Sequence, residues 1–122
     1  MIQITCKRCQ AILSNTLKEI VLDSDIIGQG EEIVEEEYYS NGHENASAMH
    51  ADRVLINTED AILLDHKKIY DYYGCCGFEL TNFLNQICPN CNLGVATIVT
   101  ECYTDHYLAF QKDKIIIIDI MQ

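Results

Sequence analysis

Short runs rich in β-branched and aromatic residues recur along the first half of the chain, with turn-forming residues between them. They predict strands at Ile2–Thr5, Ala11–Leu13, Glu19–Leu22 and Val54–Ile56. The second and third of these form a predicted hairpin, because Ser14–Asn15 supplies turn chemistry between them. This pattern favours a β-rich domain from the first residues onward.

The apolar pattern is most regular in the last third of the chain. It predicts strands at Val95–Tyr103, Tyr107–Phe110 and Ile115–Ile120, with Lys112–Lys114 as the last connection. The longest apolar run, Ile115–Ile118, is far shorter than the roughly 20 residues that a membrane-spanning helix needs. We therefore expect a single, mainly β domain over residues 1–122, with antiparallel sheets, little helix and no membrane partner.

The middle of the chain is less regular. We expect a loop at Asp23–Gly30 and a turn at Ser40–Asn45. The acidic run Glu31–Tyr39 fits an edge strand or a surface helix, and in both cases a solvated acidic face. Asn57 is followed by acids and predicts the start of a helix that runs through Leu64.

Composition narrows the class of protein and its partners. The 122 residues are 48% apolar, which favours a folded domain over a disordered acidic tail. There are 8 Lys and Arg against 19 Asp and Glu, a net charge of −11. Without a basic patch the chain lacks the main source of affinity for phosphates, so nucleic acid is not an expected partner.

Cysteine usage indicates the compartment. The chain has seven cysteines, and an odd number is a poor disulfide framework. The first fifteen residues contain no continuous apolar stretch of the kind that a secretory signal needs. We therefore expect a cytoplasmic protein with reduced thiols.

Four of the cysteines form two C-x-x-C pairs, Cys6-Lys-Arg-Cys9 and Cys88-Pro-Asn-Cys91. Two residues between the sulfurs allow a tight turn to present both thiolates to one ion. Either pair alone is also compatible with a redox dithiol. Two pairs at opposite ends of one small domain favour a single closed S₄ site, which one zinc ion or iron can fill.

Residues next to the cysteines fit such turns. Pro89 fixes φ in the second turn. Asn92, directly after Cys91, tolerates the left-handed conformation that these turns commonly need. Gln10 occupies the equivalent place in the first turn and is a less comfortable choice there.

A second set of thiols and imidazoles lies outside these pairs. One candidate is a second zinc site of the N₂S₂ type, because both residue types ligate zinc. Another is plain packing, since free cysteines are often buried as small hydrophobes. A third is a reactive thiol activated by a histidine. The candidate residues are His66, Cys75, Cys76, Cys102 and His106.

The spacing of Cys6/Cys9 and Cys88/Cys91, with β-rich sequence between and after them, resembles the β-tent class of zinc domains. That class includes yippee proteins and the thalidomide-binding domain of cereblon. The resemblance implies that both pairs hold one zinc ion where two antiparallel sheets meet. Val95 stands where those families favour tryptophan, and the chain has no tryptophan. The three-tryptophan ligand cage is therefore not expected here.

A closer resemblance is to small bacterial proteins to which no activity is assigned. They carry an N-terminal C-x-x-C, a segment like Ile56–Thr58, a His-x₈-Cys-Cys-Gly block and a C-terminal C-P-x-C followed by Cys and His. The corresponding residues here are Cys6/Cys9, His66 with Cys75-Cys76-Gly77, Cys88/Cys91, and Cys102 with His106. This resemblance implies a stand-alone bacterial domain.

The expected function is non-enzymatic. A closed S₄ shell leaves no open position for catalysis, so we expect a structural zinc domain that binds a protein or a small ligand. The alternative is a thiol-based redox sensor or cysteine-dependent enzyme that uses Cys75, Cys76 or Cys102 with His106.

Overall fold

The computed structural model describes residues 1–20, 32–41, 52–72, 77–78, 81, 83–100 and 106–120. The chain is mainly β, with short 3₁₀ turns between strands, which confirms the predicted fold class. Within these ranges, the helical segments are all too short to cross a membrane.

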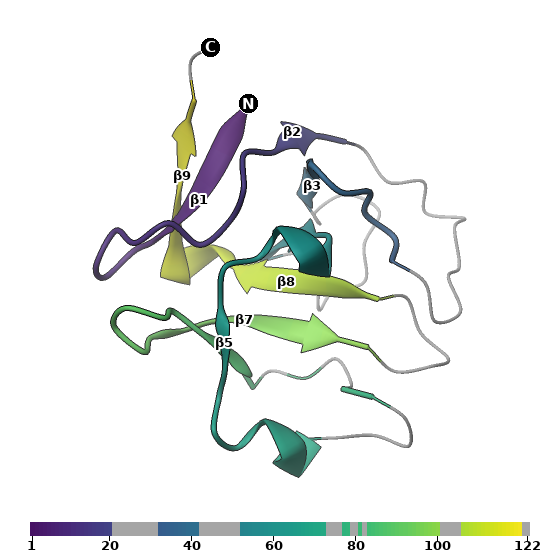
Figure 1. Cartoon of the computed structure of the whole chain (residues 1–122), viewed down its shortest axis with the longest axis vertical. Helices are drawn as coiled ribbons and strands as arrows, with labels where there is room; N and C mark the ends of the chain where they lie inside the picture. The colour runs from purple at the N-terminus through teal and green to yellow at the C-terminus, as the bar shows by residue number, and fades with distance from the viewer. Residues whose placement is uncertain are drawn as a thin grey trace.

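The strands form two sheets (Figure 1). In the smaller sheet, β1 (Ile2–Cys6) pairs antiparallel with β9 (Ile115–Asp119). The larger sheet has the order β2-β3-β4-β8-β7-β6-β5, and β2 pairs with β3 in parallel while the other neighbours are antiparallel. Its strands are β2 (Lys18–Glu19), β3 (Tyr38–Asn41), β4 (Arg53–Ile56), β5 (Leu64–Asp65), β6 (Gln86–Ile87), β7 (Gly94–Val99) and β8 (Tyr107–Gln111).

In the part of the chain that the structure describes, three 3₁₀ turns lie between the strands: η2 (Thr58–Asp60), η3 (Ile69–Tyr72) and η4 (Lys112–Lys114). The described chain passes between the sheets at two places: residues 7–17 connect β1 to β2, and η4 connects β8 to β9. These links and the packing described next position the two sheets against each other.

The main core lies between the sheets. Ile4 of β1 and Ile115 of β9 pack in one cluster with Ile56 of β4 and Phe110 of β8. A smaller cluster, which includes Leu55 and Ala109, comes from the alternate positions of the same two central strands. Strands β4 and β8 are therefore buried on both faces, which explains why they contain continuous apolar residues instead of alternating apolar and polar ones.

The predicted strands Ile2–Thr5, Val54–Ile56 and Tyr107–Phe110 are confirmed, each extended by one residue as β1, β4 and β8. Strand β9 ends at Asp119, one residue before the predicted end. The predicted strand Val95–Tyr103 is shorter than expected, since β7 ends at Val99.

The predicted hairpin between Ala11–Leu13 and Glu19–Leu22 is wrong. Residues 11–17 instead run back along β1, where the N–H of Leu13 donates to Ile4 O at 2.8 Å and the N–H of Leu17 donates to Ile2 O at 2.8 Å. Leu13 and Leu17 are fully buried there, so burial on β1 outweighs the local turn preference. Of the second predicted arm, Glu19 is the last residue of β2, which pairs with β3, and Val21 and Leu22 lie outside the described residues.

The predicted helix from Asn57 to Leu64 is one 3₁₀ turn. Asn57 does cap it, since its side chain accepts a hydrogen bond from Glu59 N at 2.9 Å. The turn ends at Asp60 because the next residues join other strands: Ala61 bridges to Ser14, and the N–H of Ile62 donates to Leu13 O at 2.8 Å. Tertiary pairing therefore replaces the second helical turn.

The acidic run is mostly irregular where the structure describes it. The run Glu31–Tyr39 is predicted to form an edge strand or a surface helix; of its described residues, 32–39, only the last two belong to β3, none is helical, and Glu37 has a left-handed φ of 75°. Ser40 and Asn41, predicted to be part of a turn, continue that strand. The predicted loop Asp23–Gly30 lies outside the described residues.

Gly77 packs against the backbone of Thr100, and a Cβ at Gly77 would lie 2.1 Å from Thr100 O. We expect Gly77→Ala to lower the free energy of unfolding by about 2 kcal/mol or more, because the contact involves backbone that cannot rotate away. Gly94→Ala is the matched control: its Cβ would lie 3.2 Å from Leu84 Cβ, and we expect a loss below about 1.5 kcal/mol. Urea denaturation measures both, and equal losses would contradict the expectation.

Candidate metal centre

The first C-x-x-C pair begins at the last residue of β1. Cys6 is the last residue of that strand, and its N–H donates to Ala11 O at 2.9 Å. The N–H of Gln10 donates back to Cys6 O at 2.8 Å, and Gln10 has a left-handed φ of 66°. The chain thus turns tightly around the pair and turns both cysteines toward one side.

The second pair repeats this geometry between β6 and β7. The N–H of Cys88 donates to Leu93 O at 2.9 Å, and the N–H of Asn92 donates to Cys88 O at 3.0 Å. Asn92 has a φ of 64°, so the predicted left-handed position is confirmed and Gln10 adopts the same conformation in the first turn. The N–H of Asn90 also points to Cys88 Sγ, at 3.4 Å.

The four sulfurs meet where the two turns face each other. All lie within 4.8 Å of one another, and the shortest separations join one turn to the other: Cys9 to Cys88 at 3.5 Å and Cys6 to Cys91 at 3.6 Å. A tetrahedron with zinc–sulfur bonds of about 2.3 Å has edges of about 3.8 Å. A disulfide would need about 2.05 Å, so these are four free thiols in a group that can hold a metal ion.

The group has a buried side and an accessible side. Cys6 and Cys88 are fully buried and belong to the main core, while Cys9 and Cys91 are partly exposed at its edge. Burial raises the pKa of the Cys88 thiol to about 11. A hydrogen bond from the Asn90 side chain lowers the pKa of Cys9. A bound cation would supply the positive charge that the buried thiols need to ionise.

Arg8 lies over the accessible side. Its Nη2 donates to Cys91 O at 2.7 Å and its Nε donates to Cys91 Sγ at 3.5 Å. This contact lowers the pKa of the Cys91 thiol to about 6. Arg8 thereby joins the first turn to the second. Sequence reasoning missed this role, although a cation between two metal-binding cysteines was the signal that could have suggested it.

The other candidate residues are only partly described. Cys75, Cys76 and Cys102 lie outside the described residues, so the second zinc site and the reactive thiol stay predictions. The Nδ1 atom of His66 accepts a hydrogen bond from Lys68 N at 3.0 Å, and its ring meets Phe83 edge-on at 4.9 Å. His106 forms a β-bridge with Glu32.

Within the ranges that the structure describes, the four-cysteine group is the one set of three or more potential metal ligands, and it includes neither His66 nor His106. The site residues predicted from the two C-x-x-C pairs therefore come together, while the two histidines each have local contacts of their own.

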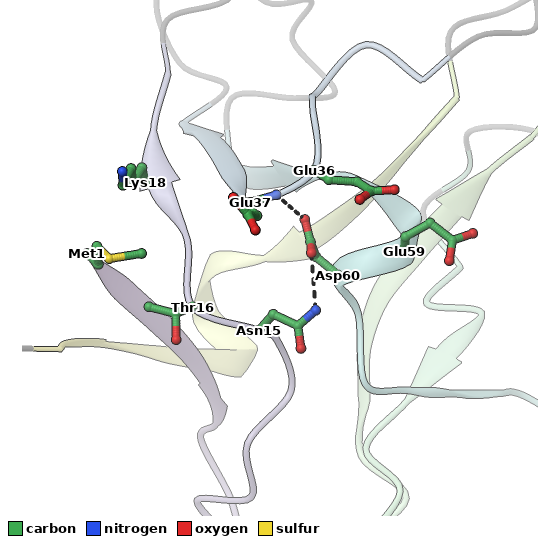
Figure 2. Close-up of a pocket in the computed structure, with 8 residues that line it drawn as sticks. All are labelled: Met1, Asn15, Thr16, Lys18, Glu36, Glu37, Glu59 and Asp60. Atoms are coloured by element: carbon green, nitrogen blue, oxygen red, sulfur yellow. Dashed lines mark hydrogen bonds between the residues drawn. The ribbon is translucent and has the colours of Figure 1, made fainter.

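A separate open cavity of about 610 Å³ lies between the start of the chain and η2 (Figure 2). Its walls carry several acids, of which Asp60 is buried. Both Asp60 oxygens already accept hydrogen bonds, from Asn15 Nδ2 at 3.1 Å and Glu37 N at 2.7 Å. Asp60 thus connects three segments of the chain. Because both of its oxygens are engaged, this buried carboxylate of the cavity wall is not free to bind a metal ion.

No protein-family model, curated protein or solved structure matches this chain significantly. The geometry of the four cysteines is therefore the basis for assigning a function.

Replacement of Arg8 tests its contact with the metal centre. We expect Arg8→Ala to weaken binding of a divalent metal ion to the four cysteines by about ten-fold or more, because residues that hydrogen-bond to metal ligands typically contribute that much. Competition with a chromophoric chelator measures the affinity. Lys7→Ala, which removes a neighbouring exposed cation, is the matched control and should leave the affinity unchanged. Equal effects of both variants would mean that only net charge matters.

Proposed function

We propose that the chain is a zinc-stabilised binding domain in which Cys6, Cys9, Cys88 and Cys91 hold one structural zinc ion. The observation that carries the proposal is the convergence of four sulfurs from two turns within 4.8 Å. Four thiolates satisfy the tetrahedral preference of zinc and leave no coordination position for a substrate or water. The ion therefore has a structural role.

The placement of the group supports that role. The turn that carries Cys6 and Cys9 follows β1 of the smaller sheet, and the turn that carries Cys88 and Cys91 joins β6 to β7 of the larger sheet. One ion bound by all four cysteines would therefore link the two sheets. This arrangement also supports the proposed kinship with β-tent zinc domains, in which an ion lies where two sheets meet. In such a domain a partner binds to the protein surface and does not coordinate the metal ion.

The identity of the metal is the first test. Purified protein analysed by mass spectrometry for metals should contain about one zinc ion per chain and should be colourless, since an iron–thiolate site absorbs visible light. Cys88→Ser should lose the ion, while Cys102→Ser, the matched control outside the four-cysteine group, should retain it. A coloured iron-containing preparation, or zinc retained by Cys88→Ser, would overturn the assignment.

Removal of the metal tests the structural role. Structural zinc sites contribute about 10–16 kcal/mol of apparent binding energy, against about 5–15 kcal/mol of net stability for a whole domain. We therefore expect a strong chelator to abolish the cooperative thermal transition followed by circular dichroism, and added zinc to restore it. An unchanged melting temperature in protein shown to be metal-free would contradict a structural role.

A further inference from the structure

Strand β9 carries a run of exposed isoleucines beside an edge that pairs with no other described strand. Three consecutive isoleucines of this strand are exposed: Ile116 by 42%, Ile117 by 41% and Ile118 by 38%. Strands β1 and β9 lie side by side and carry the two chain ends at one end of the molecule (Figure 1). Successive side chains of a strand point to opposite faces, so exposed isoleucines lie on both faces beside this edge, and a strand added at the edge would cover part of each face.

The hydrogen-bonding groups on this edge can be assigned. At the two ends of the ladder, Ile120 N donates to Met1 O at 2.8 Å and Lys7 N donates to Lys114 O at 3.1 Å. Hydrogen bonding alternates along an antiparallel pair, so the even-numbered residues of β9 face β1. Ile115, Ile117 and Asp119 therefore point their backbone N–H and C=O groups away from β1.

The opposite edge of this small sheet is already occupied. Residues 11–17 run along β1, with bridges from Ile12 to Thr5 and from Leu17 to Ile2. The sheet has two strands, so within the described residues β9 has one strand neighbour and its outer edge is open. A strand from another molecule can add there by main-chain hydrogen bonds.

The charges at one end of the edge indicate the kind of strand. Four of the eight Lys and Arg residues lie there: Lys7 and Arg8 after β1, and Lys112 and Lys114 in η4. Arg8 is engaged with Cys91, and Asp113 between the two lysines accepts a hydrogen bond from Gln111 at 2.6 Å. Lys112 and Lys114 therefore supply the positive charge that can attract acidic groups of a partner to the N-terminal end of β9.

A second copy of this chain fits the edge less well. Two β9 strands paired antiparallel about Ile117 would set Ile115 against Asp119. Asp119 would then be the only acidic residue of β9 that each copy places beside Lys112 and Lys114 of the other copy. Each copy also has a net charge of −11. A strand of another protein with several acids after its apolar residues would match both the isoleucines and the lysines.

We propose that the outer edge of β9 binds an extended segment of a partner protein as an added antiparallel strand, with acidic residues at the segment's C-terminal end beside Lys112 and Lys114. The proposal deepens the proposed binding function and rests on it. Backbone pairing supplies the affinity, and the acidic flank sets the direction.

Binding of fluorescently labelled synthetic peptides to the zinc-loaded full chain tests the proposal. The peptide TVTVTEEE should bind, and EEETVTVT and TVTVTKKK should bind at least about ten-fold more weakly, with salt reducing the difference. On binding, the amide protons of Ile115, Ile117 and Asp119 should become protected from exchange in NMR spectra. Equal affinity for all three peptides, or protection elsewhere, would overturn the proposal.

Variants separate the two parts of the interaction. Lys112→Glu/Lys114→Glu should weaken TVTVTEEE about ten-fold, whereas Lys67→Glu/Lys68→Glu, with the same charge change at another exposed pair, should not. Ile117→Pro removes an N–H that points away from β1, so it should abolish peptide binding while zinc content is retained. If that variant fails to fold, the uncharged change Ile116→Ser should weaken TVTVTEEE binding, whereas Ile62→Ser, at an equally exposed isoleucine, should not.

The outcomes also distinguish this inference from the proposed function. A zinc-loaded, stable chain that binds none of the peptides overturns the strand-addition site and leaves the structural zinc in place. A chain without zinc overturns the proposed function itself. A concentration-dependent dimer in analytical ultracentrifugation that Ile117→Pro abolishes would identify a second copy as the occupant and overturn the acidic partner strand.

Discussion

The convergence of four thiols is the constraint on which the arrangement of the two sheets depends. The sulfurs in closest contact, Cys6 with Cys91 and Cys9 with Cys88, are 85 and 79 residues apart in the chain. An ion bound by all four thiolates would close these long loops and remove much conformational entropy from the unfolded chain. Because Cys6 and Cys88 are also fully buried in the main core, the centre and the hydrophobic interior are one structure. In the described residues the chain also connects the sheets through residues 7–17, between β1 and β2, and through η4, between β8 and β9.

Local signals allowed the centre to be predicted from the sequence. Each C-x-x-C turn is determined by a few neighbouring residues, and Asn92 could be assigned a left-handed conformation from its type alone. The β-rich class and the strands β1, β4, β8 and β9 also follow from short apolar runs. For β1, β4 and β8 the burial of the segment agrees with its local preference, so sequence and tertiary structure favour the same strand. Strand β9 forms as its β-branched residues predict, although four of its five residues are exposed.

The errors fall where distant segments compete with local preference. Asn57 correctly marks the start of a turn, but the turn ends early because Ala61 pairs with Ser14, which is 47 positions earlier in the sequence. The predicted hairpin fails for the same reason, since Leu17 gains full burial against β1. Arg8 was missed because its partner, Cys91, is 83 residues away. The partner in each pairing is set by the whole fold, so a short-range pattern can mark Arg8 as a candidate but does not identify Cys91 as its partner.

The metal centre and the open edge of β9 are physically coupled. Cys6 pairs directly with Ile115, so the residue that ends β1 at the centre also fixes the position at which β9 begins. An isolated two-stranded sheet is only marginally stable in water. Here three isoleucines of the outer strand are partly exposed, so their burial contributes less to the stability of the sheet than full burial would. A stronger core could stabilise this sheet only by covering those isoleucines. Four thiolates around an ion can instead hold β1 from one end, and they leave the outer strand accessible along its length.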